Sequence, residues 1–355
     1  MASFSIHNVR IAGIHSCVPS NVVRNIDSNL FSSEDEKLKY IESVGVEERR
    51  VADDETCSSD LCYVAAENLI EKLGWEKATI DCLAFVSQTR DYIYPATACI
   101  LQHRLGLSTD CMAFDIAMGC SGWVYGMAQV ASIVQNGLVK RALLLNGETV
   151  SKTRSSFDKV NMITGDAGTA TALEYDATAR SMCFDLHTDG SGYQTIMIPA
   201  GGYRNPFKED TLAYHTDEDG VQRNNLQTIM NGADVFAFAI KCAPQTIKTL
   251  IEKFSIDKES IDYYLLHQAN MFINRKILKK IGCDRGGQMD LKTHGNTSSC
   301  SIPLLISSQI GEGIKNKKCI ACAFGVGLSW GSVFFETDGN IIIPKIVEYE
   351  YEKSI

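Results

Sequence analysis

Strand-like and helix-like runs alternate along most of this chain, and this alternation constrains its fold more than any other feature. In the first part, buried strands are predicted at 82–87, 113–118 and 141–145, and helical spacing covers 59–73 and 123–134. Alternation of this kind is typical of α/β proteins, whereas sandwiches and helical bundles use one kind of element throughout. We therefore predict an α/β fold.

The second part of the chain repeats this plan. The elements predicted there are helices at 233–254, 273–281 and 301–310 and strands at 263–266, 320–324 and 331–335. Between the two parts, residues 174–220 show little periodicity, which predicts a crossover segment and not a disordered tail. We expect two related halves, 1–178 and 179–355, that share the order of their elements and few residues.

Composition excludes several classes of protein. The 355 residues are 45% hydrophobic and 22% charged, as in soluble globular proteins. Apolar runs such as 142–145 are far shorter than the roughly 18 to 20 residues that cross a bilayer, and residues 1–5 lack the features of a secretory signal. A net charge of −9 disfavours nonspecific binding to nucleic acid. We expect a cytoplasmic protein without membrane or nucleic-acid partners.

Most of the 13 cysteines lie in apolar runs, which predicts small core side chains and no disulfide framework. Cys319 and Cys322 form a CxxC sequence within a strand-like run, where residues three apart point to opposite faces. No second CxxC completes a zinc-binding set. We expect no metal site.

Cys120 is the first candidate for chemistry, because it lies where a predicted buried strand ends and a helix begins, between Gly119 and Gly122. The positive end of a helix and its unpaired N–H groups favour thiolate over thiol, and the glycines let a substrate carbonyl approach. This environment predicts a nucleophilic cysteine. The alternative is a buried cysteine at a crowded turn.

Two further candidates lie in the second half. His267 ends the apolar strand at 263–266 and opens a polar cluster, at the strand end where α/β proteins place their sites. Asn296 lies shortly before the predicted helix at 301–310. Taken singly, His267 fits a structural histidine and Asn296 fits a helix cap.

A glycine-rich turn joins the last two predicted strands and contains Phe324, Gly325 and Val326. It fits an ordinary hairpin connection. Its functional interpretation is a backbone N–H that holds an oxyanion together with the N–H of Cys120. The sequence at 164–168 lacks the GxGxxG and GK[ST] patterns of phosphate-binding loops, and we interpret it as structural.

Together these segments resemble the motifs of the β-ketoacyl-[acyl-carrier-protein] (ACP) synthase III family of the thiolase superfamily. The matching motifs are FDIAMGCSGW at 114–123, HQAN at 267–270, GNTS at 295–298 and FGVGLSWG at 324–331. The resemblance extends over nearly the whole chain. It implies a thiolase-like five-layer αβαβα sandwich of two related halves, a homodimer, and a catalytic triad of Cys120, His267 and Asn296.

The resemblance also implies a mechanism. Cys120 takes an acyl group from acyl-CoA while the backbone N–H groups of Cys120 and Val326 hold the oxyanion. Malonyl-ACP then loses CO₂, His267 and Asn296 donate hydrogen bonds to the enolate, and a 3-oxoacyl thioester forms. CoA and ACP thioesters are the substrates, and no metal or organic cofactor is expected.

Substrate and interface contacts are implied in the same way. Phe324 and Asn270 correspond to substrate contacts, and Tyr94 corresponds to a residue that caps the acyl tunnel of the other subunit. Tyr94 fits an ordinary interface aromatic equally well. We expect the dimer interface to contain the strand that leads from Asp115 toward Cys120 and the loop that carries Tyr94.

The chain departs from well-known family members at three positions. Lys39 and Ser43 stand where a tryptophan and an arginine hold the CoA adenine, and Phe272 stands where an arginine helps to bind the carrier protein. Tyr40 is the candidate for stacking on the adenine. A basic strip on the predicted helix at 273–281 is the candidate carrier-protein contact, with a solvated helix face as its alternative; the strip consists of Arg275, Lys276, Lys279 and Lys280.

The leading functional prediction is a decarboxylating condensing enzyme that starts fatty-acid or secondary-metabolite synthesis. The main alternative is an acyltransferase that moves the acyl group from Cys120 to a hydroxyl, amine or β-keto acceptor without decarboxylation, in secondary metabolism or polysaccharide modification. A hydroxymethylglutaryl-CoA-synthase-like activity is disfavoured because its motifs differ. A structural subunit of a heterodimer is disfavoured because such partners usually lose the cysteine.

Overall fold

Two β-sheets form the centre of the protein in the computed structural model, which describes residues 2–283 and 287–351. The larger sheet mixes parallel and antiparallel pairs, and β6 forms one of its edges. Its strand order is β17 (Val347–Tyr349), β2 (Val9–Pro19), β8 (Ala167–Tyr175), β7 (Arg141–Glu148), β5 (Cys82–Val86) and β6 (Met112–Ile116).

The smaller sheet has five strands, and only its last pair, β15 and β14, is parallel. Its strand order is β1 (Ala2–Ile6), β9 (Met182–Thr188), β16 (Ser329–Glu336), β15 (Lys318–Gly325) and β14 (Tyr263–Leu266).

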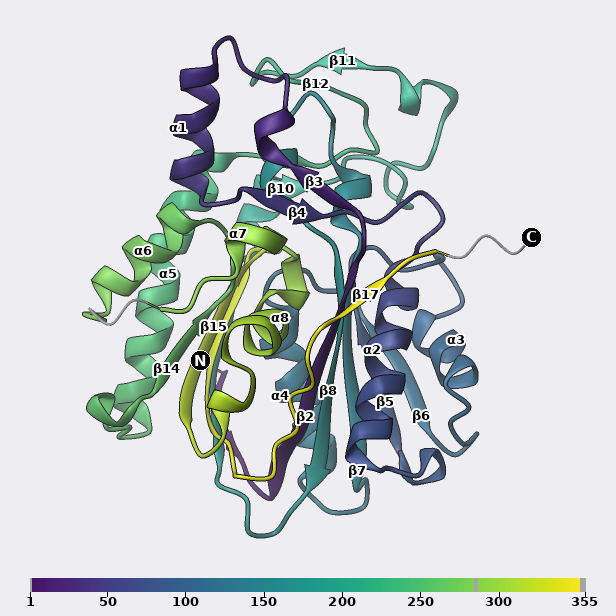
Figure 1. Ribbon diagram of the computed structural model, residues 1–355, viewed down its shortest axis with the longest axis vertical. Coiled ribbons are helices and arrows are strands. Elements are labelled where there is room, and N and C mark those ends of the chain that lie inside the picture. Colours follow the sequence, from purple (N-terminus) through teal and green to yellow (C-terminus); the bar gives the residue numbers. More distant parts are fainter. Residues whose placement is uncertain (1, 284–286, 352–355) are drawn as a thin grey trace.

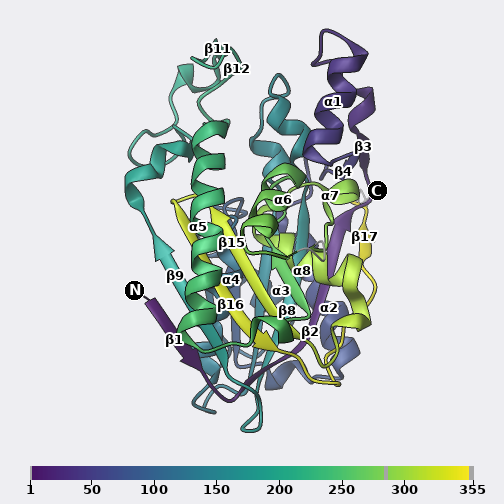
Figure 2. The ribbon, with the colours of Figure 1, turned by 90° about the vertical axis from the view of Figure 1, so that its left-hand side faces the viewer.

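Helices cover the outer faces of both sheets and fill the space between them (Figure 1). The outer layers contain α2 (Ser58–Leu73) and α3 (Thr97–Arg104) on the six-stranded sheet, and α5 (Gly232–Lys253) and α6 (Met271–Lys280) on the other. Figure 2 shows α5 lying across the outer face of the five-stranded sheet. The middle layer contains α4 (Gly122–Val134) and α8 (Ser301–Leu305). The predicted five-layer αβαβα sandwich is confirmed.

Helix α4 occupies the middle layer because it is apolar on nearly all sides. Helices of that kind are stable only when they are buried. The Trp123 indole N–H donates to Thr171 Oγ1 in the six-stranded sheet at 3.0 Å, and the Trp123 ring packs edge-on against Phe335 of the other sheet. The start of α4 therefore lies in the interior of the protein, and Cys120 with it.

Most predicted elements are confirmed, with two differences. The predicted helix at 301–310 is α-helical only as far as Leu305, and a π-helical turn follows over Ile306–Ile310. The segment at 174–220 contains the unpredicted strand β9, which lies between β1 and β16 in the five-stranded sheet. Its pattern is interrupted by a buried carboxylate, Asp185, which pairs with the Thr246 hydroxyl at 2.8 Å and with His187 at 2.6 Å.

The CxxC cysteines point to opposite faces of β15, as predicted. Cys319 belongs to the core between the sheets, whereas Cys322 packs in the core beneath α5. Within residues 2–283 and 287–351, no cluster of three or more His, Cys, Asp or Glu side chains is placed to hold a metal ion.

The two terminal strands exchange between the sheets. β1 pairs with β9, and β17 pairs with β2, so each end of the chain completes the sheet formed mainly by the other half. The expected boundary at 178/179 falls between β8 and β9, which lie in different sheets. In the described part of the chain, no helix is both long and apolar enough to cross a bilayer.

Smaller elements lie beyond one end of the sheets (Figures 1 and 2). They include α1 (Glu34–Val44) and α7 (Leu291–His294), and the short strand pairs β3 (Val22–Arg24) with β4 (Glu48–Arg50), β10 (Ile196–Met197) with β13 (Ile229–Met230), and β11 (His215–Thr216) with β12 (Gln222–Arg223).

Candidate active site

Cys120 lies in the turn between β6 and α4. The turn is closed by the Gly122 N–H, which donates to the Gly119 carbonyl at 2.7 Å. A Cβ atom on residue 119 would lie 2.3 Å from Gln88 Oε1, and one on residue 122 would lie 2.5 Å from Val86 Cγ1. A side chain at position 122 would therefore clash with the short, branched side chain of Val86, whereas one at position 119 would have to displace the flexible end of Gln88. The predicted strand-to-helix elbow around Cys120 is present.

A cavity of about 250 Å³ opens at Cys120. His267 reaches it from the end of β14, and Asn296 reaches it from the loop after α7. Phe324 and Val326 reach it from the end of β15 and the turn before β16. The structure thus brings four segments that are far apart in the sequence to one site.

Burial raises the pKa of Cys120 above its ordinary value. Hydrogen bonds from the Ser298 hydroxyl and from the backbone N–H groups of Val326 and Cys120 lower this pKa, as does the charge of Arg154. The net direction is opposite to the one predicted from the helix terminus, because removal of the thiolate from water outweighs these donors. The resting thiol is protonated. The two backbone N–H groups that favour the thiolate lie beside the sulfur, and N–H groups in this position are candidate donors to an oxyanion.

His267 is buried and held on two sides. Its Nδ1 lies 2.7 Å from Ser301 Oγ, and its ring meets Phe324 edge to face with 5.5 Å between the centroids. Burial lowers the pKa of His267 to about 3, and a hydrogen bond to the Ser298 backbone acts in the opposite direction. The imidazole is therefore neutral at physiological pH, with one nitrogen that accepts a proton and one that donates a hydrogen bond.

Asn296 is fixed through both its backbone and its side chain. Its N–H donates to the Ile163 carbonyl at 2.7 Å, and its own carbonyl accepts from the Gly165 N–H at 3.0 Å. Its Oδ1 accepts from the Ser298 N–H at 2.9 Å, and its Nδ2 lies 3.4 Å from the Ala269 carbonyl. Asn296 does not cap α8, because that helix begins five residues later at Ser301. Its amide lines the same cavity as His267.

A buried polar pair next to Cys120 was missed by the sequence analysis. Ser298 Oγ lies 3.8 Å from the Cys120 sulfur and 3.2 Å from Glu148 Oε1. Burial raises the pKa of Glu148 to about 8, against hydrogen bonds from Gln88, Ser299 and Ser298 that lower it. The carboxyl group is therefore mainly protonated at neutral pH. Glu148 ends the apolar strand β7, and the same strand-end signal that identified His267 applies to it.

Two predicted substrate contacts lie outside the residues that line the cavity in this single chain. Asn270 caps α6 instead, since its Oδ1 accepts from the Ile273 N–H at 2.8 Å. Tyr94 is 79% exposed in the loop after β5. Phe324 and Val326 do line the cavity.

The positions that depart from well-known relatives have partners of their own. Lys39 pairs with Asp35 at 2.6 Å, and the Ser43 hydroxyl donates to the Tyr40 carbonyl at 3.0 Å. The Tyr40 hydroxyl donates to the Lys159 carbonyl, and its ring packs against another aromatic side chain, so it is not a free stacking surface. The predicted basic strip lies on the exposed face of α6 and comprises Arg275, Lys276, Lys279 and Lys280.

Comparison with protein families gives two matches. The family described as 3-oxoacyl-[acyl-carrier-protein (ACP)] synthase III matches residues 114–190, which contain Cys120. The C-terminal part of the same synthase matches residues 251–337, which contain His267 and Asn296.

Individual relatives and solved structures agree with these matches. A Campylobacter jejuni protein provisionally named 3-oxoacyl-[acyl-carrier-protein] synthase 3 is 34% identical over 97% of this chain and 98% of its own length. The β-ketoacyl-[acyl-carrier-protein] synthase III of Streptococcus uberis is 32% identical over 89% of this chain and 95% of its own. The crystal structure of a 3-oxoacyl-(acyl-carrier protein) synthase from Burkholderia xenovorans superposes with a TM-score of 0.90 at 35% identity, covering 98% and 99% of the two chains.

Proposed function

This chain belongs to the β-ketoacyl-ACP (3-oxoacyl-ACP) synthase III family, and on that basis we propose that it loads an acyl group from acyl-CoA onto Cys120 and condenses it with malonyl-ACP. The enzyme is an acyltransferase of the condensing type. Homodimer formation and a cytoplasmic location belong to the same proposal. Free thiols such as the exposed Cys99 fit a reducing compartment.

In the first step, the Cys120 sulfur attacks the thioester carbonyl of the acyl-CoA. The neutral imidazole of His267 is the base that the protonated thiol requires. The backbone N–H groups of Cys120 and Val326 stabilise the tetrahedral oxyanion, the bond to the CoA sulfur breaks, and CoA leaves with the proton as a free thiol. An acyl thioester on Cys120 remains.

In the second step, malonyl-ACP loses CO₂ and the electron pair of the broken C–C bond forms an enolate. His267 and the Asn296 amide donate hydrogen bonds to the enolate oxygen. Its carbon then attacks the acyl carbonyl on Cys120, a C–C bond forms, and the bond to the Cys120 sulfur breaks. The products are CO₂, a 3-oxoacyl-ACP and the Cys120 thiolate, which takes up a proton from water to return to the resting thiol.

The observation that supports this proposal is the convergence of two backbone N–H groups, a neutral buried histidine and an amide on one cysteine. Each group suits a charge that appears during the reaction. The N–H groups of Cys120 and Val326 suit the first oxyanion, and His267 with Asn296 suits the enolate.

The test is release of labelled CO₂ from malonyl-ACP by acyl-loaded enzyme, with Cys120→Ala as the background. We expect release from the wild type and its loss in His267→Ala and Asn296→Ala. Asn296→Ala is expected to retain its acylation, read by intact mass, because loading uses the thiol, its base and the backbone N–H groups and not the Asn296 amide. His267→Ala is expected to load more slowly, because it lacks the base that deprotonates the thiol. No release above background with several acyl donors would instead indicate acyl transfer without decarboxylation.

A further inference from the structure

The cavity at Cys120 contains a positive charge that the proposed mechanism does not use. Arg154 follows the short 3₁₀ helix Val150–Thr153 and lines the cavity together with Cys120. Among the described residues that line it, Arg154 is the only one with a charged side chain other than the titratable Cys120 and His267. Its Nε and Nη1 atoms are buried and have no hydrogen-bond acceptor among the residues that the structure describes.

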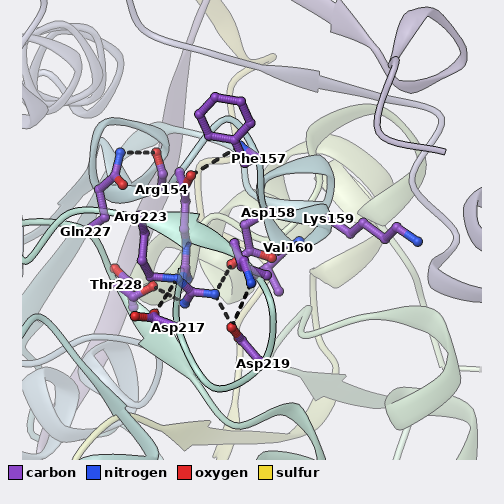
Figure 3. Close-up of polar contacts among 12 residues, drawn as sticks. Arg154, Phe157, Asp158, Lys159, Val160, Asp217, Asp219, Arg223, Gln227 and Thr228 are labelled. Atoms are coloured by element: carbon purple, nitrogen blue, oxygen red, sulfur yellow. Dashed lines mark hydrogen bonds and ion pairs between the residues drawn. The ribbon is translucent and has the colours of Figure 1, made fainter. Parts of the chain in front are cut away.

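The nearby acidic side chains are occupied by a different arginine. Arg223, which is 1% exposed, forms ion pairs with Asp217 at 2.9 Å, Asp219 at 2.7 Å and Asp158 at 3.5 Å (Figure 3). Asp158 also accepts a hydrogen bond from the Val160 N–H at 2.8 Å. These acids form their ion pairs with Arg223, and Asp158 acts on Arg154 only through its charge. Among the described residues, no carboxylate forms an ion pair or a hydrogen bond with Nε or Nη1 of Arg154.

The backbone at Arg154 is held in place by the segment that contains β12 and β13. Gln227 Nε2 donates to the Arg154 carbonyl at 3.4 Å (Figure 3), and the Thr228 N–H donates to the Thr153 carbonyl at 2.8 Å. One residue further along, the Ser155 hydroxyl donates to the Gln222 carbonyl at 2.6 Å. The backbone that carries the Arg154 guanidinium is therefore held in place by hydrogen bonds.

The other polar side chains on this wall already have partners. The Thr153 and Thr228 hydroxyls lie 3.1 Å apart, and Thr153 also donates to the Val150 carbonyl at 2.8 Å. Ile196 and Met230 add apolar surface. An unpaired arginine in such a wall is costly to bury, and the cost is relieved when a ligand supplies an acceptor.

We propose that Arg154 binds a carboxylate at the far end of the acyl group that is loaded onto Cys120, so that the preferred donors are CoA monothioesters of short dicarboxylic acids. This inference rests on the proposed acyl loading of Cys120. Arginine pairs with carboxylates through two parallel hydrogen bonds from one edge of the guanidinium, and Nε and Nη1 of Arg154 each belong to one such edge and have no acceptor among the described residues. A cavity of about 250 Å³ is slightly smaller than the roughly 300 to 1,000 Å³ of most ligand sites, and it suits a short chain.

Two other anions fit this position less well. The pantetheine phosphate is separated from the thioester by the whole pantetheine arm, whereas Arg154 and Cys120 line one small cavity. The carboxylate that malonyl-ACP loses as CO₂ would be stabilised by Arg154 before the reaction and less so as its charge moves to the enolate, which would slow the step. A carboxylate that persists through both steps has neither problem.

The test compares loading of Cys120 by succinyl-CoA and pentanoyl-CoA, and by glutaryl-CoA and hexanoyl-CoA, with intact mass as the readout and no malonyl thioester present. Pentanoyl and hexanoyl have one carbon more than succinyl and glutaryl, so each pair has a chain of equal length in non-hydrogen atoms, with a methyl group in place of a carboxylate oxygen. We expect the wild type to prefer the carboxylated donor by about 10- to 100-fold in loading rate, the range given by a charge-assisted pair. Arg154→Met and Arg154→Gln should remove or reverse that preference, and Arg154→Lys should keep part of it.

Arg204 provides a matched control, because it is an exposed arginine in the same region and does not line the cavity. Arg204→Gln should load like the wild type. Equal loading of both donors by the wild type, or a preference that survives in Arg154→Met and Arg154→Gln, would overturn the inference. A uniform loss with all donors would assign Arg154 to thiolate stabilisation instead. No adduct with any donor on the wild type would contradict the proposed function itself, so the two failures are distinct.

Discussion

Gly325 packs so closely against Cys120 that a Cβ atom on residue 325 would lie 2.8 Å from the cysteine sulfur and 2.5 Å from its Cβ. Real Cβ atoms essentially never approach other heavy atoms this closely. Gly325 also ends β15 and directly precedes Val326, whose N–H faces the sulfur. Position 325 therefore sets the distance between the nucleophile and its proposed oxyanion donor.

Gly325→Ala is expected to reduce the rate of Cys120 acylation by about 100-fold, the effect of losing one oxyanion donor. The added methyl group must push the turn away from Cys120 and take the Val326 N–H with it. Loading by acyl-CoA, followed by intact mass, measures this. Gly232→Ala is the control, because a Cβ there meets no atom within 4 Å. Wild-type loading by a folded Gly325→Ala protein would contradict the prediction.

Ser301→Ala is expected to lower the kcat of condensation about tenfold with little change in KM. Ser301 Oγ lies 2.7 Å from His267 Nδ1, and its loss frees the ring to rotate and leaves that nitrogen without its partner. Ser301→Thr retains the hydroxyl and should recover most of the activity. An equal loss of activity in both variants would indicate a packing role for Ser301 and not the positioning of His267.

Cys120, His267 and Asn296 could be identified from the sequence because each lies in a recognisable local pattern. Cys120 lies between glycines at the start of a helix, His267 lies in a polar cluster at the end of a strand, and Asn296 lies in a polar loop before a helix. Glu148 ends an apolar strand and so carries the same strand-end signal as His267, but its raised pKa and the unpaired guanidinium of Arg154 carry no local signal. Their character depends on which atoms surround them, and Arg154 is supported by residues about 70 positions further along the chain. The raised pKa of Cys120 was mispredicted for the same reason, since burial is a property of the whole fold.

Between pH 6.5 and pH 8 the free energy of unfolding of the wild type is expected to fall as Glu148 ionises. Glu148→Gln is expected to remove this part of the fall. The folded protein holds the Glu148 proton up to its pKa of about 8, whereas the unfolded chain releases it near 4.5, so this contribution is complete below pH 4.5 and is lost as the pH rises through 8. His267 has the opposite sign, because its folded pKa of about 3 is below its unfolded value of 6.5. Its stabilising contribution is complete above pH 6.5, so it does not interfere in the chosen window.

Urea unfolding midpoints of the wild type and Glu148→Gln at pH 6.5 and pH 8 measure this difference. The exposed Glu76 gives the control, since Glu76→Gln should leave the pH dependence of the wild type unchanged. The same slope in the wild type and Glu148→Gln would show that the carboxyl group is already ionised at pH 6.5.

Ile93→Asp is expected to weaken the proposed homodimer. Strand β6 is an edge of the six-stranded sheet, and the adjacent loop exposes the apolar side chains of Tyr92, Ile93 and Tyr94. A charge placed in such a patch disfavours its burial. Sedimentation at micromolar concentration should show a dimer for the wild type and more monomer for the variant. Leu138→Asp is the control and should leave the dimer intact, because Leu138 is 85% exposed in the loop after α4. If Ile93→Asp dimerises with unchanged affinity, the interface lies elsewhere.

The basic strip on α6 is expected to act on the carrier protein and not on CoA. Its side chains are exposed on the helix that starts two residues after Ala269, which lines the cavity. The positive charge on α6 should speed the encounter with a partner of opposite charge, and salt should weaken this effect. The double variant Arg275→Glu with Lys279→Glu should therefore lower kcat/KM for malonyl-ACP about tenfold at low salt and leave loading by acyl-CoA unchanged.

Lys140→Glu reverses an exposed charge at the start of β7 and should change neither step. Equal losses with malonyl-ACP and acyl-CoA would show that the double variant damages the site itself, and no loss with malonyl-ACP would leave the strip as a solvated helix face.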